Sequence, residues 1–193
     1  IPHGINIEEA VAPDATFDSS GLPESFRGKF LVSFFGRLSA EKAPADFVEI
    51  ARRLRSYDEI CFLMTGEGQE RAAVLALIER YEMQDRIHAP GFVDNFRTLM
   101  ALSDVVVVPS SLDGMPLVVF EAQACGKPVV ASAVGSIPHV IADGETGMLC
   151  VPGDVNGFAE RILTLWRSPE MRLAIGDAAR VWVRANHSAE SMT

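Results

Sequence analysis

Cysteine and histidine are scarce in this sequence, which limits the kinds of site they can build. The three cysteines and four histidines are scattered along 193 residues. They are too few and too dispersed for a disulfide framework or a zinc site. Each cysteine falls in an apolar stretch, where a free thiol behaves as a small hydrophobic side chain. Free thiols are typical of a reducing compartment, so we expect a cytoplasmic protein. There is also no Asp-x-Asp motif, and we expect no bound metal ion.

Long apolar runs and an excess of positive charge are missing as well. The longest apolar runs are about strand length, well short of the ~18 residues that cross a membrane. No amphipathic basic helix is visible, so we expect no membrane contact in this chain. The net charge is -9, whereas a nucleic-acid binder needs a basic surface. We therefore expect no nucleic-acid partner, and an anionic ligand would have to be held by a few local cations.

Two parts of the chain differ in composition. Residues 1–28 are rich in proline, glycine and acidic side chains without a period, which is typical of a linker and lead-in. The chain begins Ile1-Pro2-His3-Gly4, with neither an initiator Met nor a signal peptide. We therefore expect it to start within a longer protein. Residues 29–193 are predicted to form one domain.

Within residues 29–193, short apolar runs alternate with helical patterns. Strands are predicted over residues 30–35, 59–65, 86–92, 104–109, 128–133 and 147–151. Helices are predicted over 44–57, 69–82, 95–102, 117–124, 137–142, 154–167 and 169–186. Because the strands are continuously apolar, we expect a parallel sheet with helices on both faces, a doubly wound, Rossmann-like α/β fold. In such a fold, ligands bind at the carboxyl ends of the strands.

The loop after the first strand carries two cations. Gly36 allows close approach of the backbone, and Arg37 and Lys42 follow it. Arginine offers a planar fork for phosphate oxygens, and lysine offers a point charge. Judged by its residues alone, this segment could equally be a solvated loop. Its position at the end of a central strand favours phosphate binding.

A second loop follows the run of four valines. It reads Asp113-Gly-Met-Pro116 and leads directly into the helix predicted over 117–124. Proline suits a first helical turn, and we expect free N–H groups at Leu117 and Val118 to form an anion site with the helix dipole. Glu121 lies in this otherwise apolar helix. It either reaches solvent at a helix edge or accepts hydrogen bonds from ligand hydroxyls, such as those of a ribose.

Together these motifs resemble the C-terminal domain of retaining GT-B glycosyltransferases of family 4, also called group 1. The resemblance runs over essentially the whole chain and includes the opening Ile-Pro-His-Gly-Ile. It rests on Gly36-Arg37-x4-Lys42, Gly66-x-Gly68, Asp113-Gly-Met-Pro-x4-Glu121-Ala122, Gly126-Lys-Pro-Val-Val-Ala131 and Gly144-x2-Gly147. The segment from Asp113 to Glu121 is the most specific of these. The Gly66 and Gly144 motifs would be weak alone.

The resemblance implies a role for each of these residues. Arg37 and Lys42 would hold the diphosphate of a UDP- or GDP-sugar, and Glu121 would bind its ribose. Asp113 would face the donor sugar and the distal phosphate and complete a catalytic set with the two cations. Backbone at Gly36, Gly114, Met115, Pro116, Leu117 and Val118 would contact the donor, and backbone at Ile87 and His88 would contact the base. The side chains of Phe92 and Met115 are expected in the core.

The resemblance also implies partners and an activity. The full-length protein would be a metal-independent hexosyltransferase without a cofactor. It would use an N-terminal domain, absent from this chain, to bind a carbohydrate or lipid-linked acceptor, and would be peripheral on the inner face of the membrane. This chain alone is expected to bind nucleotide and to transfer no sugar.

The sequence departs from the family pattern at four positions. Asp113 stands where a glutamate is usual, Ser136 where a second glycine is usual, and His139 where a glutamate is usual. These three leave the identity of the sugar open. Ala43 stands in place of a common glycine, which we expect to be a minor change.

Two other classes of function remain open at this point. One is another enzyme of the same architecture, such as a UDP-sugar epimerase. A phosphorylase would need a pyridoxal-phosphate lysine in its own motif, which is not seen here. The other is a non-catalytic nucleotide-binding or regulatory module.

Overall fold

The computed structural model describes residues 21–94 and 96–187. Residues 1–20, most of the predicted linker, lie outside the described residues. The remainder of that segment includes a short 3-10 helix, η1 (Glu24–Phe26), whose Phe26 side chain is buried.

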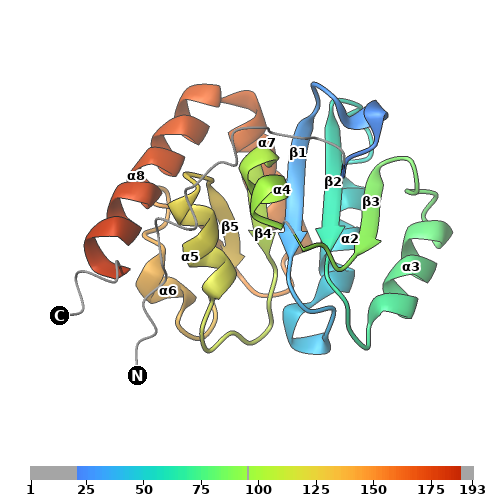
Figure 1. Cartoon of the computed structure of the whole chain (residues 1–193), viewed down its shortest axis with the longest axis horizontal. Helices are drawn as coiled ribbons and strands as arrows, with labels where there is room; N and C mark the ends of the chain where they lie inside the picture. The colour runs from blue at the N-terminus through green and yellow to red at the C-terminus, as the bar shows by residue number, and fades with distance from the viewer. Residues whose placement is uncertain (1–20, 95, 188–193) are drawn as a thin grey trace.

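Six parallel strands form a single sheet in the order β3-β2-β1-β4-β5-β6 (Figure 1). They are β1 (Phe30–Phe35), β2 (Ile60–Thr65), β3 (Ile87–Gly91), β4 (Val105–Val108), β5 (Val129–Ser132) and β6 (Met148–Cys150). The helices are α2 (Pro44–Arg53), α3 (Arg71–Arg80), α4 (Phe96–Leu102), α5 (Leu117–Ala124), α6 (Ile137–Val140), α7 (Val155–Arg167) and α8 (Pro169–His187). The predicted doubly wound α/β fold is confirmed.

Strands β1, β2, β4 and β5 are buried at every residue because they face two cores. Successive side chains of a strand point to opposite faces of the sheet. Val32 and Phe34 of β1 belong to one core, with side chains of α2, α3 and α7. Leu31 and Phe35 belong to the other, with side chains of α4, α5 and α6. Helix α8 contributes Ile175 to the first core and Val183 to the second.

The strand order reverses between β1 and β4, although all the strands are parallel. From β1 the chain proceeds to β2 and β3, and it then returns to pair β4 with the other side of β1. Ligands of doubly wound sheets bind at the carboxyl ends of the strands on either side of such a switch point. Here those ends lead into the Arg37 loop and the Asp113 loop.

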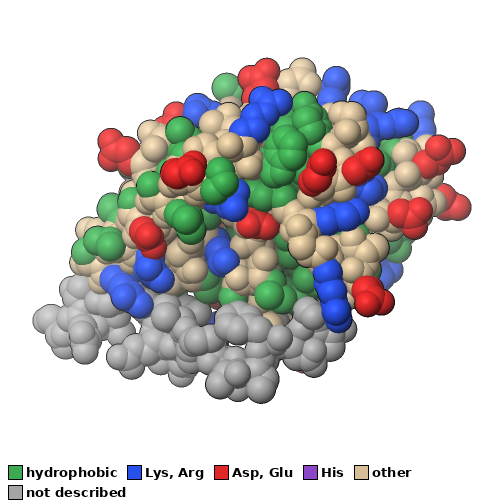
Figure 2. Space-filling model, turned by 90° about the horizontal axis from the view of Figure 1, so that it is seen from above, with side chains coloured by type: hydrophobic (Ala, Val, Ile, Leu, Met, Phe, Trp, Pro, Cys, Tyr) green, Lys and Arg blue, Asp and Glu red, His purple; other side chains and the backbone are tan. Residues whose placement is uncertain are grey.

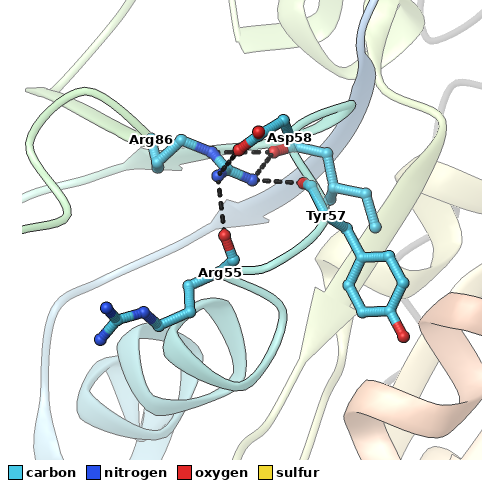
Figure 3. Close-up of polar contacts among 5 residues, drawn as sticks. Arg55, Tyr57, Asp58 and Arg86 are labelled. Carbon is cyan, nitrogen blue, oxygen red and sulfur yellow. Dashed lines mark hydrogen bonds and ion pairs between the residues drawn. The ribbon is translucent and has the colours of Figure 1, made fainter.

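The helix predicted over residues 44–57 ends earlier, at Arg53. Past this point the backbone is held by Arg86, which lies just before β3 (Figure 3). The Arg86 guanidinium donates hydrogen bonds to the carbonyl groups of Arg55 at 3.0 Å and Ile60 at 2.7 Å, and also to that of Tyr57. It forms an ion pair with Asp58 at 3.0 Å. These contacts stabilise turns in place of the last four predicted residues of the helix, 54–57.

Candidate functional site

A cavity of about 600 Å³ opens at the carboxyl ends of the central strands. Strand ends and the loops after β1, β2, β3 and β4 all contribute to its walls. The residues expected at the site that line it are Gly36, Arg37, Lys42, Met115, Leu117, Val118 and Glu121. The described structure does not place Asp113, Gly114, Pro116, Ile87 or His88 among its lining residues. Sequence motifs far apart in the chain are thus brought to one cavity.

The loop after β1 rests on the glycine pair that follows β2. A Cβ atom on Gly66 would lie 1.8 Å from the Gly36 carbonyl oxygen, and one on Gly68 would lie 2.2 Å from that of Leu38. The Leu38 N–H donates to the Glu67 carbonyl at 2.9 Å. The Gly66-x-Gly68 motif, weak as a sequence signal, therefore has a structural reason here: it lets two loops pack backbone against backbone.

Arg37 is exposed on this loop and lines the cavity. Within the described ranges, no ion pair or hydrogen bond of its guanidinium group is found. Its planar fork is therefore available to a ligand in the cavity.

Lys42 also lines the cavity, but it already has a partner. It closes the 3-10 helix η2 (Ala40–Lys42), and its Nζ atom lies 2.6 Å from Oδ2 of Asp113. The side chain of Asp113 is 2% exposed and that of Lys42 is 27% exposed. The Ser110 hydroxyl donates to the same Oδ2 atom at 3.3 Å. Two residues that the family resemblance places in one catalytic set thus form an ion pair at the cavity wall.

The residue after Lys42 adopts an unusual backbone conformation. Ala43 has φ 49°, in the left-handed region, and precedes the first turn of α2. This conformation costs a residue with a Cβ atom about 1–2 kcal/mol. Glycine would avoid that cost, so the exchange expected to be minor carries strain next to Lys42.

The loop after β5 supports Asp113 and Gly114 from behind. The Ser136 N–H donates to the Asp113 carbonyl at 3.2 Å, and the Ser136 hydroxyl donates to the Gly114 carbonyl at 3.1 Å. Gly135 has φ +54°, and a Cβ atom there would lie 1.9 Å from the Asp113 carbonyl oxygen. Two of the departures from the family pattern, Asp113 and Ser136, are thus in direct contact. The third, His139, is exposed, and it is not among the cavity's lining residues.

The start of α5 differs from the prediction in one respect. Pro116 stands just before the helix, and the Leu117 N–H donates to the Met115 carbonyl at 2.9 Å. The expectation of a free N–H at Leu117 is therefore wrong, because the chain turns tightly there. The Val118 N–H has no acceptor within the described part of the chain.

Glu121 is half-buried on α5 and lines the cavity. Burial raises the pKa of its carboxyl group, and the nearby Arg97 guanidinium partly opposes that rise in pKa. Arg97 lies over the Phe96 ring, with Cζ 5.8 Å from the ring centroid. A half-buried carboxylate facing a cavity can accept hydrogen bonds from a ligand.

The loops after β3 and β4 and the start of α4 contribute apolar side chains that the sequence assigned to the core or passed over. Phe92 is 72% exposed and Met115 is 51% exposed, so their expected place in the core is wrong. Both line the cavity, as do Val93 and Phe96. His88 instead packs edge-on against Phe26, with ring centroids 6.4 Å apart. The signal available in the sequence for Phe92 was an aromatic residue at the carboxyl end of a predicted strand, where ligands of this fold bind.

Within residues 21–94 and 96–187, no group of three or more His, Cys, Asp or Glu side chains is placed to hold a metal ion. None of the helices there has both the length and the hydropathy that a membrane crossing requires.

Comparison with known sequences adds a family. A family profile described as glycosyl transferases group 1 matches residues 21–182. N-acetyl-alpha-D-glucosaminyl L-malate synthase of Bacillus anthracis is 31% identical over 172 residues, which cover 89% of this chain and 44% of that protein. D-inositol 3-phosphate glycosyltransferase of Arthrobacter sp. (strain FB24) is 34% identical over 163 residues, covering 79% and 38%. The chain therefore spans about two fifths of the length of these curated relatives.

Solved structures share the fold. Anabaena HepE in complex with UDP superposes with a TM-score of 0.90 at 22% identity, covering 98% of this chain and 53% of that one. Sucrose-phosphate synthase from Thermosynechococcus elongatus gives 0.87 at 28% identity, covering 100% and 49%. The C-terminal domain of a glycosyl transferase group 1 protein from Francisella tularensis gives 0.85 at 22% identity, covering 96% and 100%.

Proposed function

This chain belongs to the group 1 glycosyl transferases, and from that premise we propose that it is the donor-binding domain of a glycosyltransferase. The whole enzyme transfers a hexosyl group from a nucleoside diphosphate sugar to an acceptor, with retention of anomeric configuration. A part of the protein beyond this chain binds the acceptor, a carbohydrate or a lipid-linked molecule, on the cytoplasmic side. This chain alone binds the nucleotide and transfers no sugar.

The observation that carries the proposal is the distribution of polarity in the cavity. Arg37 supplies a cation that has no ion pair with any described residue, Glu121 supplies a half-buried carboxylate, and Phe92, Val93 and Phe96 supply an apolar wall. A nucleoside diphosphate carries three matching parts, a charged diphosphate, a ribose with paired hydroxyls and a flat base. A cavity of about 600 Å³ is within the usual range for ligands of this size.

The same arrangement suits the chemistry of sugar transfer. When the bond between the anomeric carbon and the diphosphate breaks, negative charge builds up on the leaving group. Arg37, Lys42 and the Val118 N–H, which has no acceptor among the described residues, all lie at the cavity wall and stabilise charge where it develops. The two cations provide the electrostatic assistance that a divalent ion gives in other transferases, and no cofactor is required.

Titration calorimetry of this chain with UDP, GDP and ADP tests the proposal. UDP and UDP-glucose are the first probes because solved structures of Anabaena HepE contain them. We expect saturable binding of at least one nucleoside diphosphate, and no release of glucose from UDP-glucose. If folded protein binds none of the three nucleotides, the donor-domain proposal is wrong.

A further inference from the structure

We propose that Asp113 is a positioning residue that acts through Lys42, as a buried counter-charge that holds the lysine at the cavity wall and limits the affinity of the site for nucleoside diphosphate. This inference rests on the proposed function. The family resemblance assigns Asp113 to the donor sugar, whereas the geometry points to a contact with protein groups.

The contacts of the carboxylate carry the first step. Among the described residues, the Asp113 carboxylate accepts hydrogen bonds from Lys42 at 2.6 Å and from Ser110 at 3.3 Å, and both go to Oδ2. Both donors line the cavity, whereas Asp113 itself does not. With its side chain 2% exposed, the carboxylate is almost fully buried beside these two lining residues.

The backbone of Asp113 is fixed on its other side. Its carbonyl accepts the Ser136 N–H at 3.2 Å and lies where a Cβ atom on Gly135 would be, 1.9 Å away. A short side chain on a backbone held in this way has little freedom to swing past Lys42. The carboxylate therefore reaches a ligand in the cavity only through its charge and its hold on the lysine.

The charge of that carboxylate opposes a diphosphate. Asp113 offsets the charge of Lys42, and like charges repel strongly where burial lowers the dielectric screening. Net attraction for the diphosphate then comes mainly from Arg37, which has no ion pair within the described residues. A free nucleoside diphosphate carries more negative charge than its sugar ester, because its terminal phosphate is not esterified. The counter-charge therefore weakens binding of the product more than binding of the donor.

Calorimetric titration of the parent chain and Asp113→Asn with UDP and with UDP-glucose tests the inference. Asparagine keeps the shape of the side chain and removes its charge. We expect Asp113→Asn to bind UDP about 3- to 10-fold more tightly than the parent, with a smaller gain for UDP-glucose. Asp113→Glu, which keeps the charge, is expected not to gain UDP affinity.

A double variant keeps the test decisive if Asp113→Asn fails to fold. Lys42→Met alone leaves the carboxylate unpaired beside the ligand and should weaken UDP binding more than about tenfold. Lys42→Met with Asp113→Asn leaves no charge at either position, and it should recover most of that loss.

Three outcomes would overturn the inference. The first is that Asp113→Asn loses UDP-glucose affinity while its UDP affinity is unchanged. The second is that Asp113→Asn binds both ligands as the parent does. The third is that the double variant binds UDP as weakly as Lys42→Met alone. These differ from failure of the proposed function, in which the parent chain itself binds no UDP.

Discussion

Two arginines at opposite ends of the sheet show how the same side chain serves different purposes. Arg86 lies at the amino end of β3, and its side chain is 15% exposed. All three of its nitrogens donate to residues 55–60, just before and at the start of β2 (Figure 3). Arg37 lies at the carboxyl end of β1, is exposed, and has no ion pair in the described part of the chain. A guanidinium with all its bonds made within the protein stabilises the fold, whereas one without such bonds at a cavity is available to a ligand.

The two edges of the sheet differ in the same way. Figure 2 views the molecule from the amino ends of the strands, where acidic and basic side chains are interspersed. At the carboxyl edge, Gly36, Gly66 and Gly135 all have positive φ angles, and the ion pair between Lys42 and Asp113 lies in the cavity wall. Changes at the amino edge should therefore affect stability alone, and changes at the carboxyl edge should affect binding.

The largest loss of stability is expected at Gly66, where a contact between two loops at the carboxyl edge supports both the fold and the binding cavity. In Gly66→Ala the new Cβ atom would lie 1.8 Å from the Gly36 carbonyl, at φ +135°. We expect a loss of about 3–5 kcal/mol in the free energy of unfolding, combining overpacking with backbone strain, together with weaker UDP binding.

Gly144→Ala is the matched control for Gly66→Ala. Gly144 has φ +80° but no heavy atom within 4 Å of the added Cβ position. Gly144→Ala should lose only the about 1–2 kcal/mol of unfolding free energy that backbone strain costs. Equal losses for the two variants in urea unfolding would show that contact between the loops contributes nothing.

Arg86→Ala should separate stability from binding at the amino edge. Its removal leaves the carbonyl groups of Arg55, Tyr57 and Ile60 without this donor. We expect a loss of about 2–4 kcal/mol in the free energy of unfolding, with UDP affinity unchanged within about twofold. Arg161→Ala, which breaks an exposed ion pair with Asp143, should cost at most about 1 kcal/mol. A large drop in UDP affinity for Arg86→Ala would contradict the division between the edges.

Arg37→Ala should give the opposite result to Arg86→Ala. We expect UDP binding to weaken by about 1.5–3 kcal/mol, the contribution of a charge-assisted hydrogen bond. The free energy of unfolding should stay within about 0.5 kcal/mol of the parent. Arg53→Ala, at an exposed arginine near the end of α2, is the control and should bind normally.

Lys42→Ala should lower both UDP affinity and the stability of the fold. It should weaken UDP binding by about 1.5–3 kcal/mol, as for Arg37→Ala. It should also lower stability, because it leaves the buried Asp113 without its ion pair. If Arg37→Ala and Lys42→Ala both bind UDP as the parent does, the phosphate site is wrongly assigned.

The smallest expected effect is a pH-dependent gain in stability at Glu121. Burial raises the folded-state pKa of this carboxyl above its ordinary value of 4.5. The folded protein therefore favours the protonated form, and this contribution to stability is full below pH 4.5 and is lost as the pH rises through the folded-state pKa. Glu121→Gln should be more stable than the parent at neutral pH, and the difference should shrink towards pH 4.5. A difference independent of pH in urea titrations would contradict this.

The sequence predicted the fold well because local patterns determine it. Valine-rich runs such as Val105–Val108 and periodic helices such as Val155–Arg167 were found to within two residues. Helix ends were less accurate where a distant group intervenes, as Arg86 does beyond Arg53. Gly36, Arg37, Lys42 and Glu121 were placed at one cavity because parallel strands end at one edge.

Other features of the site depend on contacts between distant residues. The ion pair between Lys42 and Asp113 joins residues 71 positions apart, and no local pattern specifies it. The exposure of Phe92 depends on how the loop after β3 leaves the sheet, so an aromatic residue there was assigned to the core. The hydrogen bond from Leu117 to Met115 depends on the local turn geometry before α5.

A crystal structure of this chain with UDP tests the central claim most directly. The account predicts diphosphate oxygens within hydrogen-bonding distance of the Arg37 guanidinium. It also predicts ribose hydroxyls at the Glu121 carboxylate, with the Asp113 carboxylate still bonded to Lys42. UDP bound outside this cavity, or in it without contact to Arg37, would contradict the account.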